Sequence, residues 1–142
     1  MGPESLRALL ELPLEAIEIA AFGGTNFAKL ELLRAEESKQ RYMEPVSRIG
    51  HDAYEMTEMI NDIVEDNIKI RCRQIIISGG IRSFLDGLYL ISRCKLPAVY
   101  GQASGLLEYA SQSYEDLKKF MEYQIDGIKL ARAYLVIKDS DR

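Results

Sequence analysis

The chain has 142 residues, of which 47% are hydrophobic and 28% are charged, and its net charge at pH 7 is −4. Such a length suits one domain with enough apolar material for a core. No cluster of Lys and Arg is present, which argues against a nucleic-acid-binding surface, and no apolar run approaches the roughly 18 residues of a membrane span. Cys72 and Cys94 lie far apart without a CxxC pattern, which favours a reducing compartment. We therefore expect one cytoplasmic domain over residues 1–142 that binds neither nucleic acid nor membranes.

The first half of the chain is predicted to alternate helix and strand. Leu6, Leu9 and Leu10 have helical spacing and predict a helix over 4–12 that Pro13 ends. Ile17 and Ile19 on one face predict a buried strand over 15–22. We then expect a helix over 27–39, a long loop over 40–50 and an amphipathic helix over 51–66 with Asp52 at its N-cap.

The second half repeats the pattern. Three consecutive isoleucines predict a strand over 74–78 that is covered on both faces. Ser83 and Asp86 form a capping-box-like start for a helix over 83–93, and Ser113 with Asp116 opens a long final helix to about residue 137. Between them we expect a strand over 96–101 and a short helix over 105–110. The apolar side of the final helix is predicted to contain Leu117, Phe120, Met121, Ile125, Ile128, Ala131 and Leu135.

This order of elements predicts an α/β fold with parallel strands and right-handed crossovers. Only three strands are clear. Three covered strands are compatible with a small open sheet and with part of a closed barrel.

Two of the predicted strands end in a Gly-Gly pair, Gly23-Gly24 followed by Thr25, and Gly79-Gly80 followed two residues later by Arg82. Glycine lets backbone N–H groups approach an anion, and a hydroxyl and a guanidinium add donors that suit phosphate. The helix after Arg82 would add its positive N-terminal end. Each Gly-Gly pair alone is also typical of a tight turn, but two on successive strands favour an anion site.

The third strand is followed by Gly101, Gln102 and Ala103, whose N–H groups are further candidates for the same phosphate, although the spacing alone favours an ordinary strand-to-helix turn. His51, the only histidine, is interpreted as a cap or surface residue, and no metal ligands are predicted. The acidic residues of the helix over 51–66 are interpreted as a solvated face: Glu55, Glu58, Asp62, Glu65 and Asp66.

Beyond these patterns, the chain resembles type 2, flavin-dependent isopentenyl-diphosphate isomerase, in the C-terminal part of its barrel. The resemblance covers nearly all 142 residues and rests on four segments in the family's order, Ala21-Phe22-Gly23-Gly24-Thr25-Asn26-Phe27, Gly50-His51-Asp52-Ala53, Ile76 to Asp86, and Ala98-Val99-Tyr100-Gly101-Gln102-Ala103. The Ser-Gly-Gly-Ile-Arg element alone is shared with other FMN barrels, such as the 2-hydroxy-acid oxidases.

The resemblance implies a partial TIM (β/α)₈ barrel, with about the last three β/α units and a long C-terminal helix. It implies FMN as cofactor, with Thr25, Gly79, Gly80 and Arg82 at the flavin phosphate and Gln102 and Ala103 nearby. In the family, reduced FMN and Mg²⁺ interconvert isopentenyl and dimethylallyl diphosphate, and NAD(P)H is the usual reductant. The family's substrate, Mg²⁺ and flavin-lysine residues lie in the first five strands, so no catalytic residue is assigned here and we expect this chain alone to be inactive.

Two other functions stay open, a fragment of a 2-hydroxy-acid-oxidase-type enzyme and a non-catalytic phosphate-binding module. This chain has no histidine near the arginine-bearing strand, where 2-hydroxy-acid oxidases carry one, and this argues against the first of the two functions. A three-strand piece of a barrel also leaves two free edges and an uncovered face. We therefore expect the chain to form homo-oligomers or to pair with a separate N-terminal half.

Overall fold

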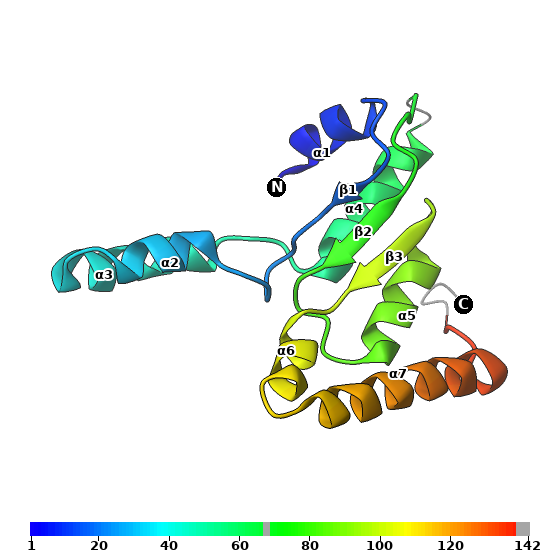
Figure 1. Ribbon diagram of the computed structural model, residues 1–142. Helices are drawn as coiled ribbons and strands as arrows, with labels where there is room; N and C mark the ends of the chain where they lie inside the picture. Colours follow the sequence, from blue (N-terminus) through cyan, green and yellow to red (C-terminus); the bar gives the residue numbers. More distant parts are fainter. Residues whose placement is uncertain (67–68, 139–142) are drawn as a thin grey trace.

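A computed structural model describes residues 1–66 and 69–138 (Figure 1). Within these ranges, helices and strands alternate as α1 (Pro3–Leu10), β1 (Ile17–Glu18), α2 (Phe27–Leu33), α3 (Glu37–Met43), the 3₁₀ helix η1 (Glu44–Arg48), α4 (Ala53–Glu65), β2 (Ile75–Ser78), α5 (Phe84–Arg93), β3 (Ala98–Gly101), α6 (Ser104–Ala110) and α7 (Tyr114–Tyr134). The predicted α/β class is confirmed.

The three strands form one parallel sheet in the order β1-β2-β3. Ile17 is level with Ile75 and Ile75 with Ala98. Regular β1 is shorter than predicted because Ala20 takes a positive φ of 37°. Main-chain bonding nevertheless continues beyond it, since Ala21 N donates to Ser78 O at 2.7 Å. The chain therefore stays attached to β2 as far as the first Gly-Gly pair.

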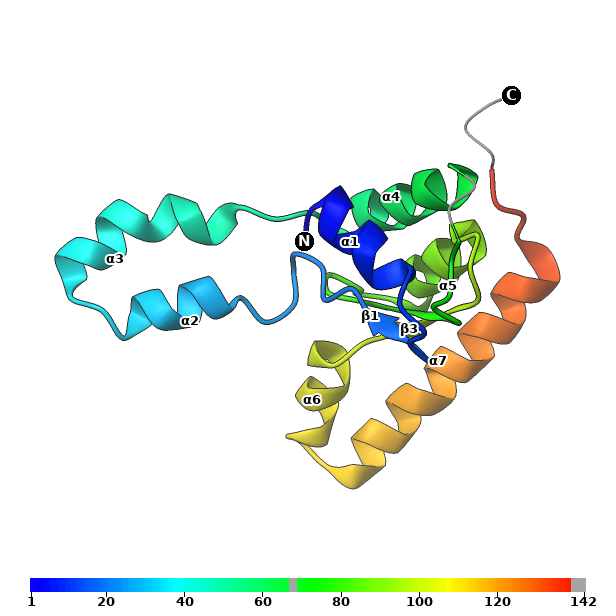
Figure 2. The same cartoon turned by 90° about the horizontal axis from the view of Figure 1, so that it is seen from above.

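One face of the sheet carries the core. Ile17 and Ile19 from the first strand segment and Ile75 and Ile77 from β2 are buried there. They pack in one cluster with apolar residues of α1, α4 and α5 that include Leu6, Leu10, Met56, Ile60 and Leu90. Figure 2 shows α1, α4 and α5 together on one side of the sheet, away from α6 and α7. Burial of these side chains, worth roughly 1.5–3 kcal/mol each, is the main stabilisation of the fold.

The opposite face, which we call the open sheet face, contains Glu18, Ile76, Ser78 and Val99. Glu18, Ile76 and Val99 are register neighbours on the three strands. Val99 is 51% exposed, and Glu18 is also exposed. Successive side chains of a strand point to opposite faces, so the β2 run of isoleucines is half covered here and not covered on both faces as predicted.

The prediction of one helix over 27–39 followed by a loop is wrong. The chain turns between α2 and α3, and a helix and a 3₁₀ helix occupy most of the expected loop. At this turn Gln40 Nε2 donates to Ala35 O at 2.8 Å. The two helices form an arm that projects from the sheet (Figure 1), and neither contains a buried residue. The apolar residues at helical spacing in α2 and α3 therefore do not face the core.

The predicted helix caps are confirmed. Asp52 and Ser83 each accept a hydrogen bond from the third residue of their helix in a complete capping box. Ser113 accepts from Asp116 N at 3.0 Å and starts α7. Only part of the predicted apolar side of α7 is buried. Ala131 is 4% exposed, whereas Leu135 is 61% exposed. The contact that holds α7 to α5 includes the Phe84 ring against Gly127.

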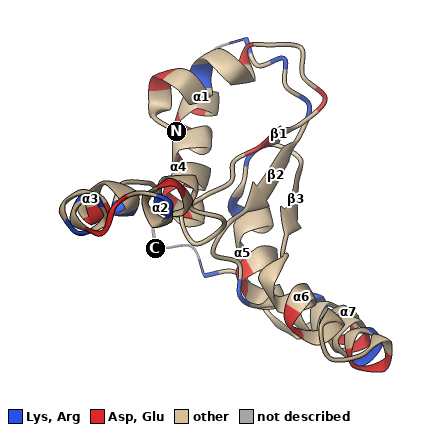
Figure 3. Ribbon diagram, turned by 60° about the vertical axis from the view of Figure 1, so that its left-hand side comes forward, with Lys and Arg blue, Asp and Glu red and all other residues tan. Residues whose placement is uncertain are grey.

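The predicted solvated face of α4 is confirmed, since all of its acidic residues are exposed except the half-buried Glu58. Three acidic residues of α4 and its C-cap also form ion pairs with neighbouring elements. Asp66 pairs with Arg7 of α1, Glu65 with Lys95, and Glu58 with Arg93. The Glu58 carboxylate accepts two bonds from Arg93, both 3.1 Å, and raises the pKa of that guanidinium. Figure 3 shows acidic and basic residues intermixed on the helices. None of the helices in the described ranges is long and apolar enough to cross a membrane.

Candidate functional site

The two Gly-Gly pairs pack directly against each other at the carboxyl ends of β1 and β2. Gly23, Gly79 and Gly80 all have positive φ, between 74° and 104°. A Cβ on Gly79 would stand 2.0 Å from Ala21 O, and one on Gly23 would stand 2.7 Å from Gly80 Cα. Glycine is therefore required here for the close contact of two loops, whatever else the loops bind.

This contact forms one wall of a cavity of about 710 Å³. Five of the six predicted binding residues line it, namely Thr25, Gly79, Gly80, Gln102 and Ala103. They come from the loops after all three strands, which converge because the strands are parallel neighbours. The structure thus brings together residues that are up to 78 positions apart in the chain, from Thr25 to Ala103 (103 − 25).

Several hydrogen-bond donors of these loops are free. The backbone N–H groups of Gly79, Gly80 and Ala103 donate to no acceptor in the described part of the chain, and the Thr25 hydroxyl makes no hydrogen bond there. Successive N–H groups in a turn of positive φ make a concavity that suits an anion. The cavity wall therefore offers uncommitted donors of the type that bind phosphate oxygens.

Arg82, the sixth predicted residue, is not among those that line the cavity. Its side chain is exposed, and its carbonyl oxygen accepts a hydrogen bond of 2.8 Å from Gln102 Nε2. The same carboxylate oxygen of Asp86 accepts from Arg82 N and Ser83 N at 3.1 and 2.9 Å. The N-terminus of α5 is thus already occupied by its own carboxylate, which weakens the contribution predicted for the helix dipole.

Sequence reasoning missed the charged residue of the cavity lining, Glu18. It lies on the open sheet face, and among the lining residues in the described ranges it is the only charged one. Its Oε1 accepts a 2.7 Å hydrogen bond from the Ser78 hydroxyl. Strand alternation was the available signal, because Glu18 lies between the two core residues Ile17 and Ile19.

His51 lies beside these loops without a position of its own in the cavity. Its carbonyl oxygen accepts a 2.8 Å hydrogen bond from Phe22 N, and its Nδ1 is 3.7 Å from a carboxylate oxygen of Glu55. These contacts fit the interpretation of His51 as a residue next to a helix cap. Within the described residues, no three His, Cys, Asp or Glu side chains form a group that would hold a metal ion.

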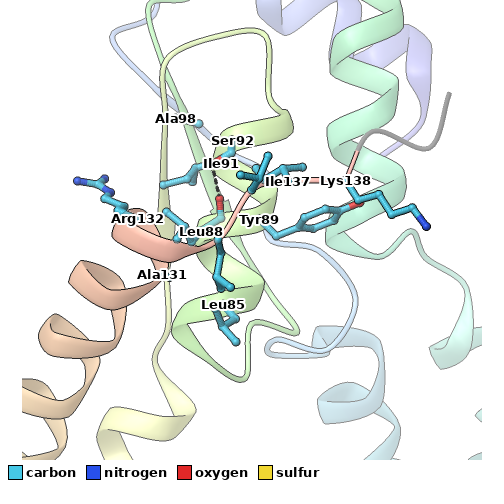
Figure 4. Close-up of a pocket in the computed structure, with 12 residues that line it drawn as sticks. Leu85, Leu88, Tyr89, Ile91, Ser92, Ala98, Ala131, Arg132, Ile137 and Lys138 are labelled. Atoms are coloured by element: carbon cyan, nitrogen blue, oxygen red, sulfur yellow. Dashed lines mark hydrogen bonds between the residues drawn. The ribbon is translucent and has the colours of Figure 1, made fainter. Parts of the chain in front are cut away.

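A second cavity, of about 590 Å³, lies between α5 and the end of α7 (Figure 4). Its lining is mostly apolar and includes Leu85, Leu88 and Ile91. The hydroxyl of Ser92 donates to Leu88 O at 2.7 Å within the helix. The cavity contains none of the predicted site residues, and we regard the loop cavity as the candidate site.

Comparison with known proteins finds isomerases to which this chain is similar. The chain is 31% identical over 128 residues to isopentenyl-diphosphate delta-isomerase of Ignicoccus hospitalis, covering 89% of this chain and 34% of that protein. The chain is a relative of the isopentenyl-diphosphate delta-isomerases. The isomerase of Stutzerimonas stutzeri is 29% identical over 126 residues, or 88% of this chain and 34% of that protein. That of Bacillus licheniformis is 29% identical over 86 residues, or 61% and 22%.

The chain spans about a third of the length of the Ignicoccus hospitalis and Stutzerimonas stutzeri isomerases. No protein-family model and no solved structure matches it. The family resemblance read from the Gly-Gly-Thr and Ser-Gly-Gly-Ile-Arg segments is confirmed at the level of the isomerase name.

Proposed function

We propose that this chain forms the C-terminal part of a flavin-dependent isopentenyl-diphosphate isomerase and contributes the phosphate site for FMN. The observation that carries the proposal is the convergence of Thr25, Gly79, Gly80, Gln102 and Ala103 on one cavity in a relative of these isomerases. The free N–H groups and the Thr25 hydroxyl supply the donors. When bound, FMN would supply the chemistry that moves protons at the substrate carbon, and these residues would bind and orient its phosphate end.

The barrel is part of the same proposal. Consecutive strands that are parallel neighbours, with α4 and α5 outside them, match the arrangement of successive units in a (β/α)₈ barrel. The open sheet face would then be the interior of the barrel, and the remaining strands would come from a longer polypeptide or from a separate one. Mg²⁺, NAD(P)H and the diphosphate substrate would be held mainly by that remaining part.

Titration of the purified chain with FMN, followed by flavin fluorescence, tests the phosphate site. Arg82 does not line the cavity, but its exposed side chain directly follows the lining residue Ile81. If that side chain turns to the phosphate, Arg82→Ala should weaken FMN binding by about tenfold, the loss expected when a charged hydrogen-bond donor to phosphate is removed. Arg73→Ala is the matched control, because Arg73 pairs with Glu15 at the amino-terminal end of the strands. Riboflavin, which lacks the phosphate, should bind the parent and Arg82→Ala equally. FMN binding that Arg82→Ala leaves unchanged would show that Arg82 has no phosphate role.

Supplying the missing part in trans tests the isomerase role. The chain is expected to be inactive alone and to convert isopentenyl to dimethylallyl diphosphate when mixed with the N-terminal two thirds of the Ignicoccus hospitalis relative. FMN binding without activity in the mixture would instead favour a non-catalytic phosphate-binding module. The same mixture carrying Thr25→Ala provides the control that ties activity to the site.

A further inference from the structure

The arm formed by α2 and α3, residues 27–43, has an apolar stripe that nothing in the described part of the chain covers. Phe27, Leu30 and Leu33 lie three positions apart on α2 and are 75%, 45% and 63% exposed. Residues at this spacing are neighbours on one face of a helix. Figure 2 shows the arm projecting away from the sheet and from the other helices. These three residues, which we call the α2 stripe, therefore run from the end of the arm near the sheet to its far end.

The arm lacks the packing that normally stabilises short helices. Its two helices have seven residues each, and neither contains a buried residue. Isolated helices of this length are marginal in water, and most helical stability in proteins comes from packing of an apolar face. The arm is fixed instead by polar contacts, such as the bond from Asn26 Nδ2 to Ser47 O near the sheet. Burial of the α2 stripe against a partner would supply the missing stabilisation.

The charges of the arm differ between its two ends. Glu36, Glu37 and Lys39 lie at the far end, which is acidic on balance, whereas Lys29 and Arg41 lie in the halves of their helices nearer the sheet. All five side chains are exposed, and none takes part in an ion pair within the described ranges. The other charged residues of the arm pair with each other. An arm of this kind is complementary in charge to a second arm that runs in the opposite direction.

We propose that the arm is a self-association site, at which the α2 stripes of two copies of this chain pack antiparallel about a two-fold axis. Leu30 is the middle residue of the stripe and lies near the axis, and Phe27 of each copy packs against Leu33 of the other. The same arrangement brings the acidic far end of each arm to the basic end of the other. A second copy is the occupant because the stripe and the charges complement themselves in this one arrangement. The inference is independent of the flavin site and of the isomerase role.

Size-exclusion chromatography with light scattering tests the proposal on the full chain carrying Val99→Lys, which removes association through the open sheet face. This chain should have the mass of two copies at high concentration. It should dissociate on dilution, because the arm is shorter than the roughly 20–30 residues that each partner contributes to a standard interface. Adding Leu30→Glu should weaken the association by roughly a hundredfold, since two carboxylates would be buried beside each other at the axis. Leu130→Glu, at a 60% exposed position of α7, is the matched control and should leave the mass unchanged.

Exchange of charges tests the antiparallel arrangement. Glu36→Lys with Glu37→Lys makes both ends of the arm basic, and Lys29→Glu with Arg41→Glu makes both ends acidic. Each double variant alone should self-associate about tenfold more weakly, because like charges then face each other. An equimolar mixture of the two should form dimers again, since every end then meets an opposite charge. Circular dichroism of each variant confirms that the fold is kept.

The outcomes separate the possible covers of the arm. A Val99→Lys chain that is monomeric at high concentration overturns the proposal and leaves the missing part of the barrel as the cover of the stripe. A dimer that Leu30→Glu leaves intact also overturns it, because the contact then lies elsewhere. Dimers that form no more readily in the mixture than in either double variant alone overturn the antiparallel arrangement.

Discussion

Gly79 meets the carbonyl oxygen of Ala21 so closely that a Cβ on Gly79 would stand 2.0 Å from that oxygen. Because Gly79 also has a φ of 92°, two separate physical constraints exclude a side chain at this position. The contact joins the loops that follow β1 and β2 and fixes the shape of the candidate cavity at their junction.

Gly79→Ala should therefore destabilise the chain by at least ~2 kcal/mol, the combined cost of strained backbone and steric overlap. Urea denaturation followed by circular dichroism measures the change. Gly2→Ala is the control, since a Cβ on Gly2 has nothing within 4 Å and should alter stability little. Equal midpoints for the two variants would mean that the loops are not in contact.

Asn61 connects α4 to the end of α5. Its side chain donates to Arg93 O at 3.0 Å and accepts from Lys95 N at 2.8 Å, and the residue is only 8% exposed. Asn61→Ala leaves both backbone groups without their partner and should cost about 1–3 kcal/mol in unfolding free energy. The exposed neighbour Asp62 is the control, and Asp62→Ala should stay within about 0.5 kcal/mol. An Asn61→Ala chain as stable as the parent would contradict this bridging role.

The thiol of Cys94 should be less reactive in the folded chain than in the unfolded one. Burial raises the pKa of Cys94, so its thiolate fraction at a given pH is smaller when the chain is folded. The folded state consequently holds its proton to higher pH, and this contribution to stability is complete below the ordinary thiol pKa and is lost as the pH rises through the folded value. Thiolate absorbance across a pH titration in Cys72→Ser, with and without urea, measures the difference. A lower midpoint for the folded chain would refute it.

The open sheet face should make the isolated chain self-associate. Val99 is 51% exposed on a parallel sheet whose β1 and β3 edges have no strand partner among the described residues. Size-exclusion chromatography with light scattering should give a concentration-dependent mass above that of one chain, and Val99→Lys should lower it. Glu115→Lys, an exposed position on α7, controls for the added positive charge. A parent that stays monomeric at high concentration would argue against the uncovered face.

The sequence by itself determined the features that act over a few residues. Isoleucine runs located β1 and β2, and side chains three positions apart identified the caps of α4, α5 and α7. It also identified Thr25, Gly79, Gly80, Gln102 and Ala103 as a set, because each follows a strand and parallel strands end at one edge of their sheet. A hydrogen bond between residues three positions apart, or a periodic pattern of apolar residues, depends only on nearby residues and can therefore be predicted from the sequence.

Only the tertiary structure decided the relations between distant segments. It showed that position 79 must be glycine because its Cα lies against the Ala21 carbonyl oxygen. It showed that Glu18 lines the cavity whereas Arg82 does not. It also showed that Glu58 pairs with Arg93. These depend on which face a residue takes once the sheet has formed and on how two loops meet. Such contacts join residues tens of positions apart, and the residue types alone are compatible with several partners.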